Sequence, residues 1–279
     1  MAYVPINIDE SVRKECKRRK YSDKTIKTYL YCINRFLIWC KKDIGKISKK
    51  DVREFLFYLS NKNLAGNTLN TYHMAIRFLF EDILDKRIWI DIKYSKTPKK
   101  LPVVLSKDEV KALFEVIDNK KHLLMIELMY GAGLRVSELT NLRVEDLSID
   151  KGFGFVRHGK GGKDRIFILP GRLKGKIWTL INEQKLKTGD FLFKTNRNGK
   201  YSIRSLQQIL KKASKKAKLG RMISPHTLRH SFATHLLENG CDVSSVQALL
   251  GHKSPETTFT YLHIASPNMI NVKSPIDSL

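Results

Sequence analysis

The sequence predicts a mainly α-helical protein of two domains, with a small β-hairpin or sheet in the second domain. Three observations predict this fold class. Apolar residues recur at helical spacing through residues 11–90, a basic segment with two prolines lacks periodicity at 93–102, and two β-rich runs flank a glycine-rich turn within 152–170. The expected limits of the first domain, linker, second domain and tail are residues 1–95, 96–104, 105–265 and 266–279.

The first domain is expected to be a compact helical bundle, because its helices are joined by short polar connections. Ser22 is the expected N-cap of one helix, and Gly45 is expected to end it. Ser48 caps the next helix, which has Asp51 in its first turn, and a third helix begins at Asn67.

The second domain is expected to begin with a helix whose Ser106 and Glu109 have the spacing of a capping box, followed by a helix through 123–130. The glycine-rich turn then joins two strands as a hairpin. Four more helices start at polar caps, two of them with proline in the first turn, at Ser202, Ser224-Pro225, Asp242 and Ser254-Pro255. Three of these four are expected to end near Lys218, Gly240 and Gly251.

The chain of 279 residues has a formal net charge of +25, shared almost evenly between residues 1–100 and the remainder. Two strongly basic domains suggest a polyanion bound between them, the alternative being a solubilising surface. Six basic side chains lie within residues 11–20. On a helix they form a charged flank that suits a phosphate backbone or is merely solvated.

The four cysteines form no C-x-x-C pair, which favours reduced core thiols over a disulfide framework or a zinc site; they are Cys16, Cys32, Cys40 and Cys241. The first ten residues lack the pattern of a signal peptide. No run approaches the roughly 18 apolar residues that would cross a bilayer. The sequence therefore predicts a cytoplasmic protein without a membrane partner.

His226 and Arg229 stand three residues apart in a predicted helix, so we expect their side chains on one face. The pair alone fits a structural role as well as a chemical one. His226 and His230 have the spacing of some zinc ligands, but the glutamate of the H-E-x-x-H pattern is missing. No metal is therefore expected.

Three further residues stand at helix junctions or ends: Arg135 follows two glycines, His252 follows Gly251, and Tyr261 lies in the last expected helix. Each alone has an ordinary explanation, as a turn residue, a partner of the helix dipole or a half-buried aromatic. In one basic chain, together with His226-x-x-Arg229, they combine a nucleophilic hydroxyl with cations and imidazoles. Such a set can attack a phosphodiester without a metal.

These residues and their surroundings resemble the tyrosine recombinases of the phage-integrase and Xer group. The resemblance covers about residues 101–263, and the first domain matches the family's core-binding domain more loosely. The stretches that carry it are LPVVLSKDEV, GAGLRVSEL, HGKGGKDR, SPHTLRHSFATHLLENG and VQALLGHKSPETTFTYLHI.

The resemblance implies a two-domain, C-shaped clamp on double-stranded DNA, with Tyr261 as the nucleophile. Tyr261 would form a 3′-phosphotyrosyl link and leave a free 5′-hydroxyl. Arg135 and Arg229 would hold the non-bridging phosphate oxygens, a task that suits the planar, permanently charged guanidinium group. His252 would add a hydrogen bond to the phosphate.

The resemblance also implies that His226 moves a proton and that Lys160, at the hairpin tip, protonates the leaving 5′-oxygen. Lys163 is a competing candidate for that proton. No cofactor is expected, and the covalent intermediate makes ATP unnecessary. A homo-tetramer on DNA is implied, with the tail at 266–279 docking on a neighbouring protomer or simply frayed.

Two departures bear on the subclass. Leu262 stands where the family often has threonine, and the length leaves no room for the arm-site domain of many phage integrases. The sequence thus favours an Xer-like enzyme that resolves chromosome or plasmid multimers. The alternatives are the integrase of a mobile element, a topoisomerase with a 3′-linked tyrosine, and a DNA-binding module without activity, against which the complete set of six residues argues.

Overall fold

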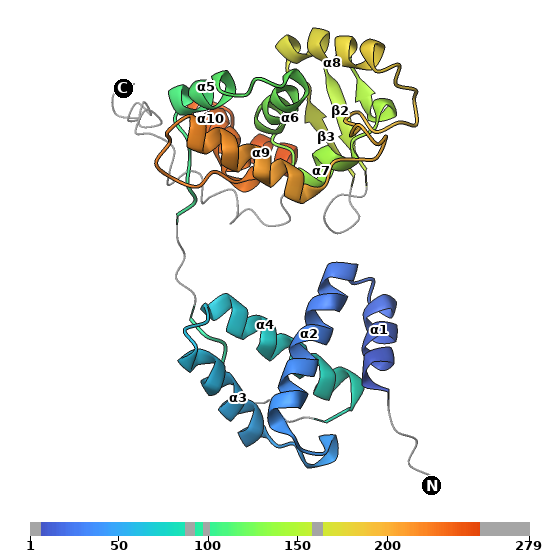
Figure 1. Cartoon of the computed structure of the whole chain (residues 1–279), viewed down its shortest axis with the longest axis vertical. Helices are drawn as coiled ribbons and strands as arrows, with labels where there is room; N and C mark the ends of the chain where they lie inside the picture. The colour runs from blue at the N-terminus through green and yellow to red at the C-terminus, as the bar shows by residue number, and fades with distance from the viewer. Residues whose placement is uncertain (1–6, 87–92, 97–100, 158–163, 252–279) are drawn as a thin grey trace, which may run out of the picture. The chain divides into compact units, whose positions relative to one another are not determined.

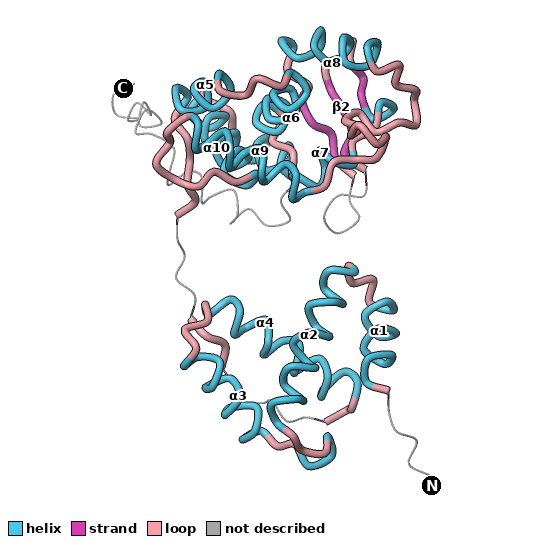
Figure 2. Tube along the Cα trace, in the orientation of Figure 1, coloured by secondary structure: helices cyan, strands magenta, loops and turns pink. Residues whose placement is uncertain are grey.

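The computed structural model describes residues 7–86, 93–96, 101–157 and 164–251. The chain divides into two compact units, Met1–Lys100 and Leu101–Leu279, which we call unit 1 and unit 2 (Figure 1). Both are dominated by helices, and strands occur only in unit 2 among the described residues (Figure 2). Within those residues no helix is both long enough and apolar enough to cross a membrane.

Unit 1 is a helical bundle. Its elements are α1 (Ile8–Arg18), α2 (Asp23–Cys40), the 3₁₀ turn η1 (Ile44–Lys46), α3 (Lys49–Asn61), α4 (Gly66–Arg77) and the π-helical turn η2 (Phe78–Ile83). Aromatic rings from three of these elements, Phe36, Phe55 and Phe80, are completely buried at its centre. The rings of Phe36 and Phe55 lie 5.2 Å apart between centroids, so α2 and α3 are fixed by an aromatic contact.

The expected cap of α2 is confirmed, because the Ser22 hydroxyl accepts a hydrogen bond from the backbone N–H of Thr25 at 3.2 Å. Its expected end at Gly45 was wrong. The helix ends at Cys40, where Lys41 adopts the left-handed conformation with φ of 50° and donates its N–H to the carbonyl of Leu37. The helix is therefore ended by a lysine in the left-handed conformation, whereas we expected a glycine to end it.

The start of α3 depends on Asp51. Its buried carboxylate accepts hydrogen bonds from the backbone N–H and the hydroxyl of Ser48, both at 2.8 Å. It also forms an ion pair with Lys42, at 2.5 Å. The hydrogen bond from Lys42 is the main reason why the pKa of Asp51 is lowered to about 2. A negative charge here also suits the positive end of the helix dipole.

Hydrogen bonds hold the segment between the two units at both of its ends. Asn70 in α4 accepts the backbone N–H of Ser95 at 2.8 Å and donates to its carbonyl at 3.1 Å. Beside it, the ring of Tyr94 contacts the buried ring of His73, with 4.6 Å between centroids and 37° between the ring planes. On the unit 2 side, the N–H of Leu105 binds the hydroxyl of Ser231 at 2.9 Å.

Unit 2 consists of a small antiparallel sheet and a set of helices. Its elements are α5 (Lys107–Glu115), α6 (Lys120–Gly131), α7 (Val136–Asn141), η3 (Val144–Asp146), β1 (Leu147–Ser148), β2 (Phe153–Val156), β3 (Arg165–Ile168), α8 (Gly171–Glu183), α9 (Ile203–Lys216), α10 (Pro225–Glu238) and α11 (Val243–Leu250). The strand order is β1-β2-β3, and β2 pairs with β3 from Phe153↔Ile168 to Val156↔Arg165. The expected hairpin is therefore confirmed.

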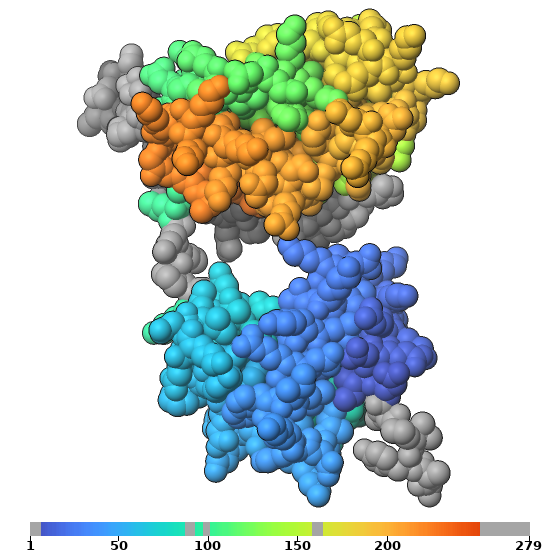
Figure 3. Space-filling view, in the orientation of Figure 1, coloured from blue at the N-terminus to red at the C-terminus, as the bar shows by residue number. Residues whose placement is uncertain are grey.

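Helix α10 is the centre of unit 2. Helices α6, α9 and α11 all pack against it, so it is buried on several sides. The expected start is confirmed: Pro225 is the first helical residue, and the Ser224 hydroxyl accepts the N–H of Thr227 at 3.2 Å. Both α9 and α10 form part of the surface of unit 2 that is visible in Figure 3.

We predict that Asp51→Asn lowers the free energy of unfolding of unit 1 by about 1–2 kcal/mol, because it removes the charge that Lys42 and the Ser48 cap require. Urea denaturation followed by circular dichroism measures the change. The matched control is Asp43→Asn, whose pair with Lys46 is solvent-exposed at 3.5 Å and is expected to change stability by less than about 0.5 kcal/mol. Equal effects of the two substitutions would contradict the role given to Asp51.

Candidate active site

Arg135 is held at the start of α7 by one carboxylate. Glu138 accepts the backbone N–H of Arg135 at 2.8 Å with one oxygen and the guanidinium group at 2.7 Å with the other. The side chain of Arg135 keeps 19% of its surface exposed, whereas that of Glu138 keeps 5%. The cap and the ion pair therefore fix Arg135 with its guanidinium group at the edge of the protein interior.

Gly133 brings the chain to Arg135 through a tight junction after α6. Its φ is +59°, and a Cβ atom here would lie 2.4 Å from the ring of Phe232 in α10. Only glycine satisfies both constraints. The segment that carries Arg135 can therefore lie directly against α10.

The same carboxylate binds a second guanidinium group. Arg165, the first residue of β3, donates to Glu138 at 2.7 Å and to the carbonyl of Leu249 in α11 at 2.5 Å. Burial alone would raise the pKa of Glu138, but the charge of Arg165 and the hydrogen bonds from Arg135 outweigh it, so that this pKa is lowered. Glu138 is therefore ionised at neutral pH.

Arg229 in α10 is more deeply buried than Arg135, with 3% of its surface exposed. Its guanidinium group donates to the carbonyl of Gly133 at 2.5 Å and to the carbonyl of Leu250. These two carbonyls lie two residues before Arg135 and two residues before His252 in the sequence. Arg229 thus links the backbone segments that lead to two other predicted site residues.

His226 and Arg229 do not share one environment, although the helical spacing predicts a common face. His226 lies in the first turn of α10 and is exposed, while Arg229 is buried one turn later. The rings of His226 and His230 lie 6.3 Å apart between centroids. Burial, and then the charges of His226 and Arg229, lower the pKa of His230 to about 4, so its ring is neutral at neutral pH.

Helix α11 ends at a glycine that contacts Arg165. Asp242 caps the helix by accepting the N–H of Ser245 at 2.9 Å, as the sequence predicts. Gly251 follows with φ of +61°, and a Cβ atom on it would lie 2.7 Å from Cδ of Arg165. The backbone immediately before His252 is therefore set against the side chain of Arg165.

Three of the six predicted site residues, Lys160, His252 and Tyr261, lie outside the described residues, as do Lys163 and the tail. Lys160 belongs to the connection between β2 and β3, which starts after the pair Val156↔Arg165. Arg229 binds the backbone two residues before Arg135, through the carbonyl of Gly133.

Glu138 and Arg165 were not among the site residues predicted from the sequence, although each left a signal. Glu138 stands at capping-box spacing from Arg135, and both residues lie in the stretches that carry the family resemblance. Arg165 is the single cation of the strand Arg165–Ile168, which otherwise consists of apolar residues. A charged residue in that position indicates a specific buried partner.

Comparisons with known proteins cover both units. The model of the phage integrase family matches residues 103–267, and that of the phage integrase N-terminal SAM-like domain matches residues 9–91. The chain is 38% identical to tyrosine recombinase XerA of Thermococcus kodakarensis over 250 residues, 87% of this chain and 86% of the relative. It is 35% identical to tyrosine recombinase XerD of Oceanobacillus iheyensis, with 90% and 91% covered.

Solved structures agree with these sequence matches. The crystal structure of XerA recombinase has a TM-score of 0.56 at 29% identity, covering 94% of this chain and 95% of that one. XerH recombinase bound to palindromic difH substrate gives a TM-score of 0.73 at 25% identity, covering 94% and 82%. Because both domain models and full-length relatives agree, this chain belongs to the phage integrase family and is an Xer-like tyrosine recombinase, a site-specific enzyme of DNA recombination.

Proposed function

We propose that this recombinase cleaves double-stranded DNA by attack of Tyr261 on a backbone phosphate, leaving a 3′-phosphotyrosyl link and a free 5′-hydroxyl. Arg135, Arg229 and His252 bind the phosphate oxygens. His226 transfers a proton, and Lys160 protonates the leaving 5′-oxygen. The similar XerH site-specific recombinase was solved bound to its palindromic difH substrate, in a post-cleavage complex.

One observation carries the phosphate-binding part of this proposal. Arg135 and Arg165 share the single carboxylate of Glu138, so the trio retains one positive charge. A largely buried cation without full compensation favours an anionic ligand. Because Arg135 is the more exposed of the two arginines, it is the one that can reach a DNA phosphate.

Fixed arginines stabilise the charge that develops on the phosphate in the transition state. Arg135 is oriented by Glu138 before DNA binds, so no free energy is spent on ordering it during the reaction. A guanidinium group can donate two parallel hydrogen bonds to a phosphate and remains charged at any working pH. In this mechanism the protein's own cations do what a metal ion does in many other nucleases.

The covalent intermediate conserves the free energy of the phosphodiester. The 5′-hydroxyl of a partner strand attacks the phosphotyrosine, which restores the DNA backbone and releases the Tyr261 hydroxyl, and no ATP is consumed. Two cleavages on each of two duplexes require four protomers. The enzyme therefore acts as a homo-tetramer on DNA. Its proposed role is the resolution of chromosome or plasmid multimers.

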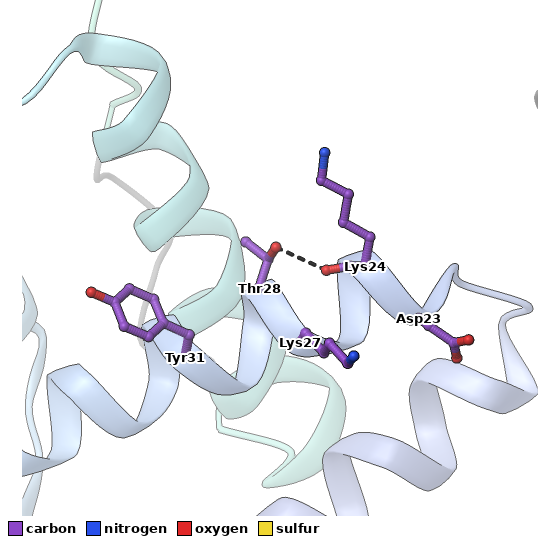
Figure 4. A pocket seen from close by; sticks show the side chains of 5 residues that line it. All are labelled: Asp23, Lys24, Lys27, Thr28 and Tyr31. Carbon is purple, nitrogen blue, oxygen red and sulfur yellow. Dashed lines mark hydrogen bonds between the residues drawn. The ribbon is translucent and has the colours of Figure 1, made fainter. Parts of the chain in front are cut away.

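Part of the DNA interface lies on α2 of unit 1. Lys24, Lys27 and Tyr31 are exposed on one side of this helix and line a shallow pocket with Asp23 and Thr28 (Figure 4). Flexible lysines suit phosphate oxygens, and an exposed tyrosine can contact sugar or base. We therefore place a phosphate-binding stripe on α2, consisting of Lys24, Lys27 and Tyr31.

The basic run in α1 is less available than its sequence suggests. Arg18 and Arg19 both bind Glu15, at 2.6 Å and 2.7 Å, and Arg19 also binds Asp82 at 2.5 Å. Lys14 binds Glu10 at 3.0 Å, so at least three of the six cations have partners within unit 1. The stripe on α2 is the better candidate for contact with DNA.

Tyr261→Phe is expected to bind DNA but to form no covalent adduct, because the nucleophilic oxygen is gone. Nicked suicide DNA containing the recombination site traps the adduct, which denaturing gel electrophoresis detects. Arg135→Ala is expected to form the adduct about 10²–10³-fold more slowly. A trapped adduct with Tyr261→Phe, or loss of wild-type turnover on addition of a chelator, would contradict the mechanism.

The double variant Lys24→Ala, Lys27→Ala is expected to weaken DNA binding and to reduce the slope of log Kd against log salt by about 1.8, since two phosphate contacts are lost. Fluorescence anisotropy over a series of salt concentrations measures the slope. The matched control is Lys46→Ala, Lys50→Ala, which removes two lysines paired with Asp43 and Glu54 beyond the C-terminal end of α2. An equal change in both double variants would rule out the α2 stripe.

Deletion of residues 266–279 is expected to prevent assembly beyond a single occupied site, because we propose that this tail docks on a neighbouring protomer. Sedimentation of the protein with DNA carrying two sites reports the assembly. Binding to a DNA fragment with one site serves as the control and is expected to persist. Unchanged sedimentation of the two-site complex would refute tail docking.

A further inference from the structure

Arg165 contacts several parts of the site. It is the first residue of β3, directly after the connection that contains Lys160. Its side chain is 9% exposed and binds Glu138 and the carbonyl of Leu249. The same side chain lies against Gly251, the residue before His252.

We propose that Arg165 is a positioning residue that orients Arg135 through Glu138 and ties the β2–β3 hairpin to the end of α11. The inference rests on the proposed function, in which Arg135 binds the DNA phosphate. Arg165 itself touches neither DNA nor the reacting atoms. Its effect passes through the carboxylate that it shares with Arg135.

The cost of burying Arg165 indicates that its geometry matters. Burial lowers the pKa of this arginine, and the ion pair with Glu138 only partly opposes that effect. Its Nε atom has no hydrogen-bond partner among the described residues. Apolar side chains that replace a whole buried ion pair are often as stable as the pair, so stability alone does not explain why Glu138 and Arg165 are charged here.

The bridge that Arg165 makes requires two donors held in one plane. One terminal nitrogen binds the carboxylate of Glu138 in α7, and the other binds the carbonyl of Leu249 in α11. Lysine has a single charged nitrogen and cannot hold both acceptors in this geometry. Without the bridge, Glu138 can rotate, and the guanidinium group of Arg135 loses its fixed direction.

Gly251 supports the same assignment from the backbone side. A Cβ atom at this position would meet Cδ of Arg165 at 2.7 Å, and the φ of +61° already excludes most other residues. The stem of Arg165 thus fills the space that a side chain at position 251 would need. The course of the chain before His252 and the conformation of Arg165 are set together.

The experiment measures the single-turnover rate of covalent adduct formation on nicked suicide DNA, together with the Kd for DNA and the thermal unfolding midpoint. Arg165→Gln is expected to reduce the rate by about 100-fold, the order of loss that a 1 Å displacement of a site residue produces. The Kd is expected to change by less than about threefold. Arg165→Lys is expected not to restore the rate, because the charge without the bridge is insufficient.

The matched control is Arg172→Gln. Arg172 is also an arginine of unit 2 paired with a buried carboxylate, but it lies in the first turn of α8 and binds Glu127 of α6, at 3.4 Å, rather than Glu138. Its substitution is expected to leave the rate of adduct formation unchanged. If Arg165→Gln unfolds, Arg165→Met replaces it, since methionine keeps the apolar stem and removes both donors.

A second background separates positioning from general destabilisation. In Arg135→Ala, the further change Arg165→Gln is expected to reduce the rate by less than about tenfold, because the residue through which it acts is absent. A rate of Arg165→Gln and Arg165→Met equal to wild type, or the same loss in both backgrounds, would overturn the inference. An adduct with Tyr261→Phe would instead overturn the proposed function, whatever the Arg165 variants do.

Discussion

The site is organised around a single buried carboxylate shared by two arginines. Glu138 fixes Arg135 through both its backbone and its side chain, and it keeps its own charge because Arg165 lies on its other side. If either guanidinium group were removed, a buried charge would be left partly uncompensated, which proteins tolerate poorly. The arrangement therefore gives Arg135, the cation that we propose binds the phosphate, its direction before any substrate arrives.

Arg229 complements this trio by acting on the backbone. Its hydrogen bonds to the carbonyls of Gly133 and Leu250 join α10 to the two segments that end in Arg135 and His252. Helices α6, α9 and α11 pack against α10. The two segments are therefore attached to a well-packed helix. Catalytic groups gain precision when they are mounted on such elements and their supporting contacts are also ordered.

Helix starts could be predicted from the sequence, whereas the end of α2 and the contact between Glu138 and Arg165 could not. Helix starts at Ser22, Ser224 and Asp242 were predictable, since a cap needs only residues three apart. The end of α2 at Lys41 was not, because a left-handed lysine leaves no signal in the sequence. Nor was the bridge from Glu138 to Arg165, which joins residues that are 27 apart in the chain, on a helix and a strand.

The fastening of the chain on both sides of the interdomain segment has a consequence for binding strength. Ser95 is tied to α4 and Leu105 to α10, so the stretch between them reaches at most about 35 Å when fully extended. Once one unit has captured a duplex, so short a tether holds the other at an effective concentration on the order of millimolar. In the proposed function both units bind the duplex, so neither contact has to be tight for the protein to stay on DNA.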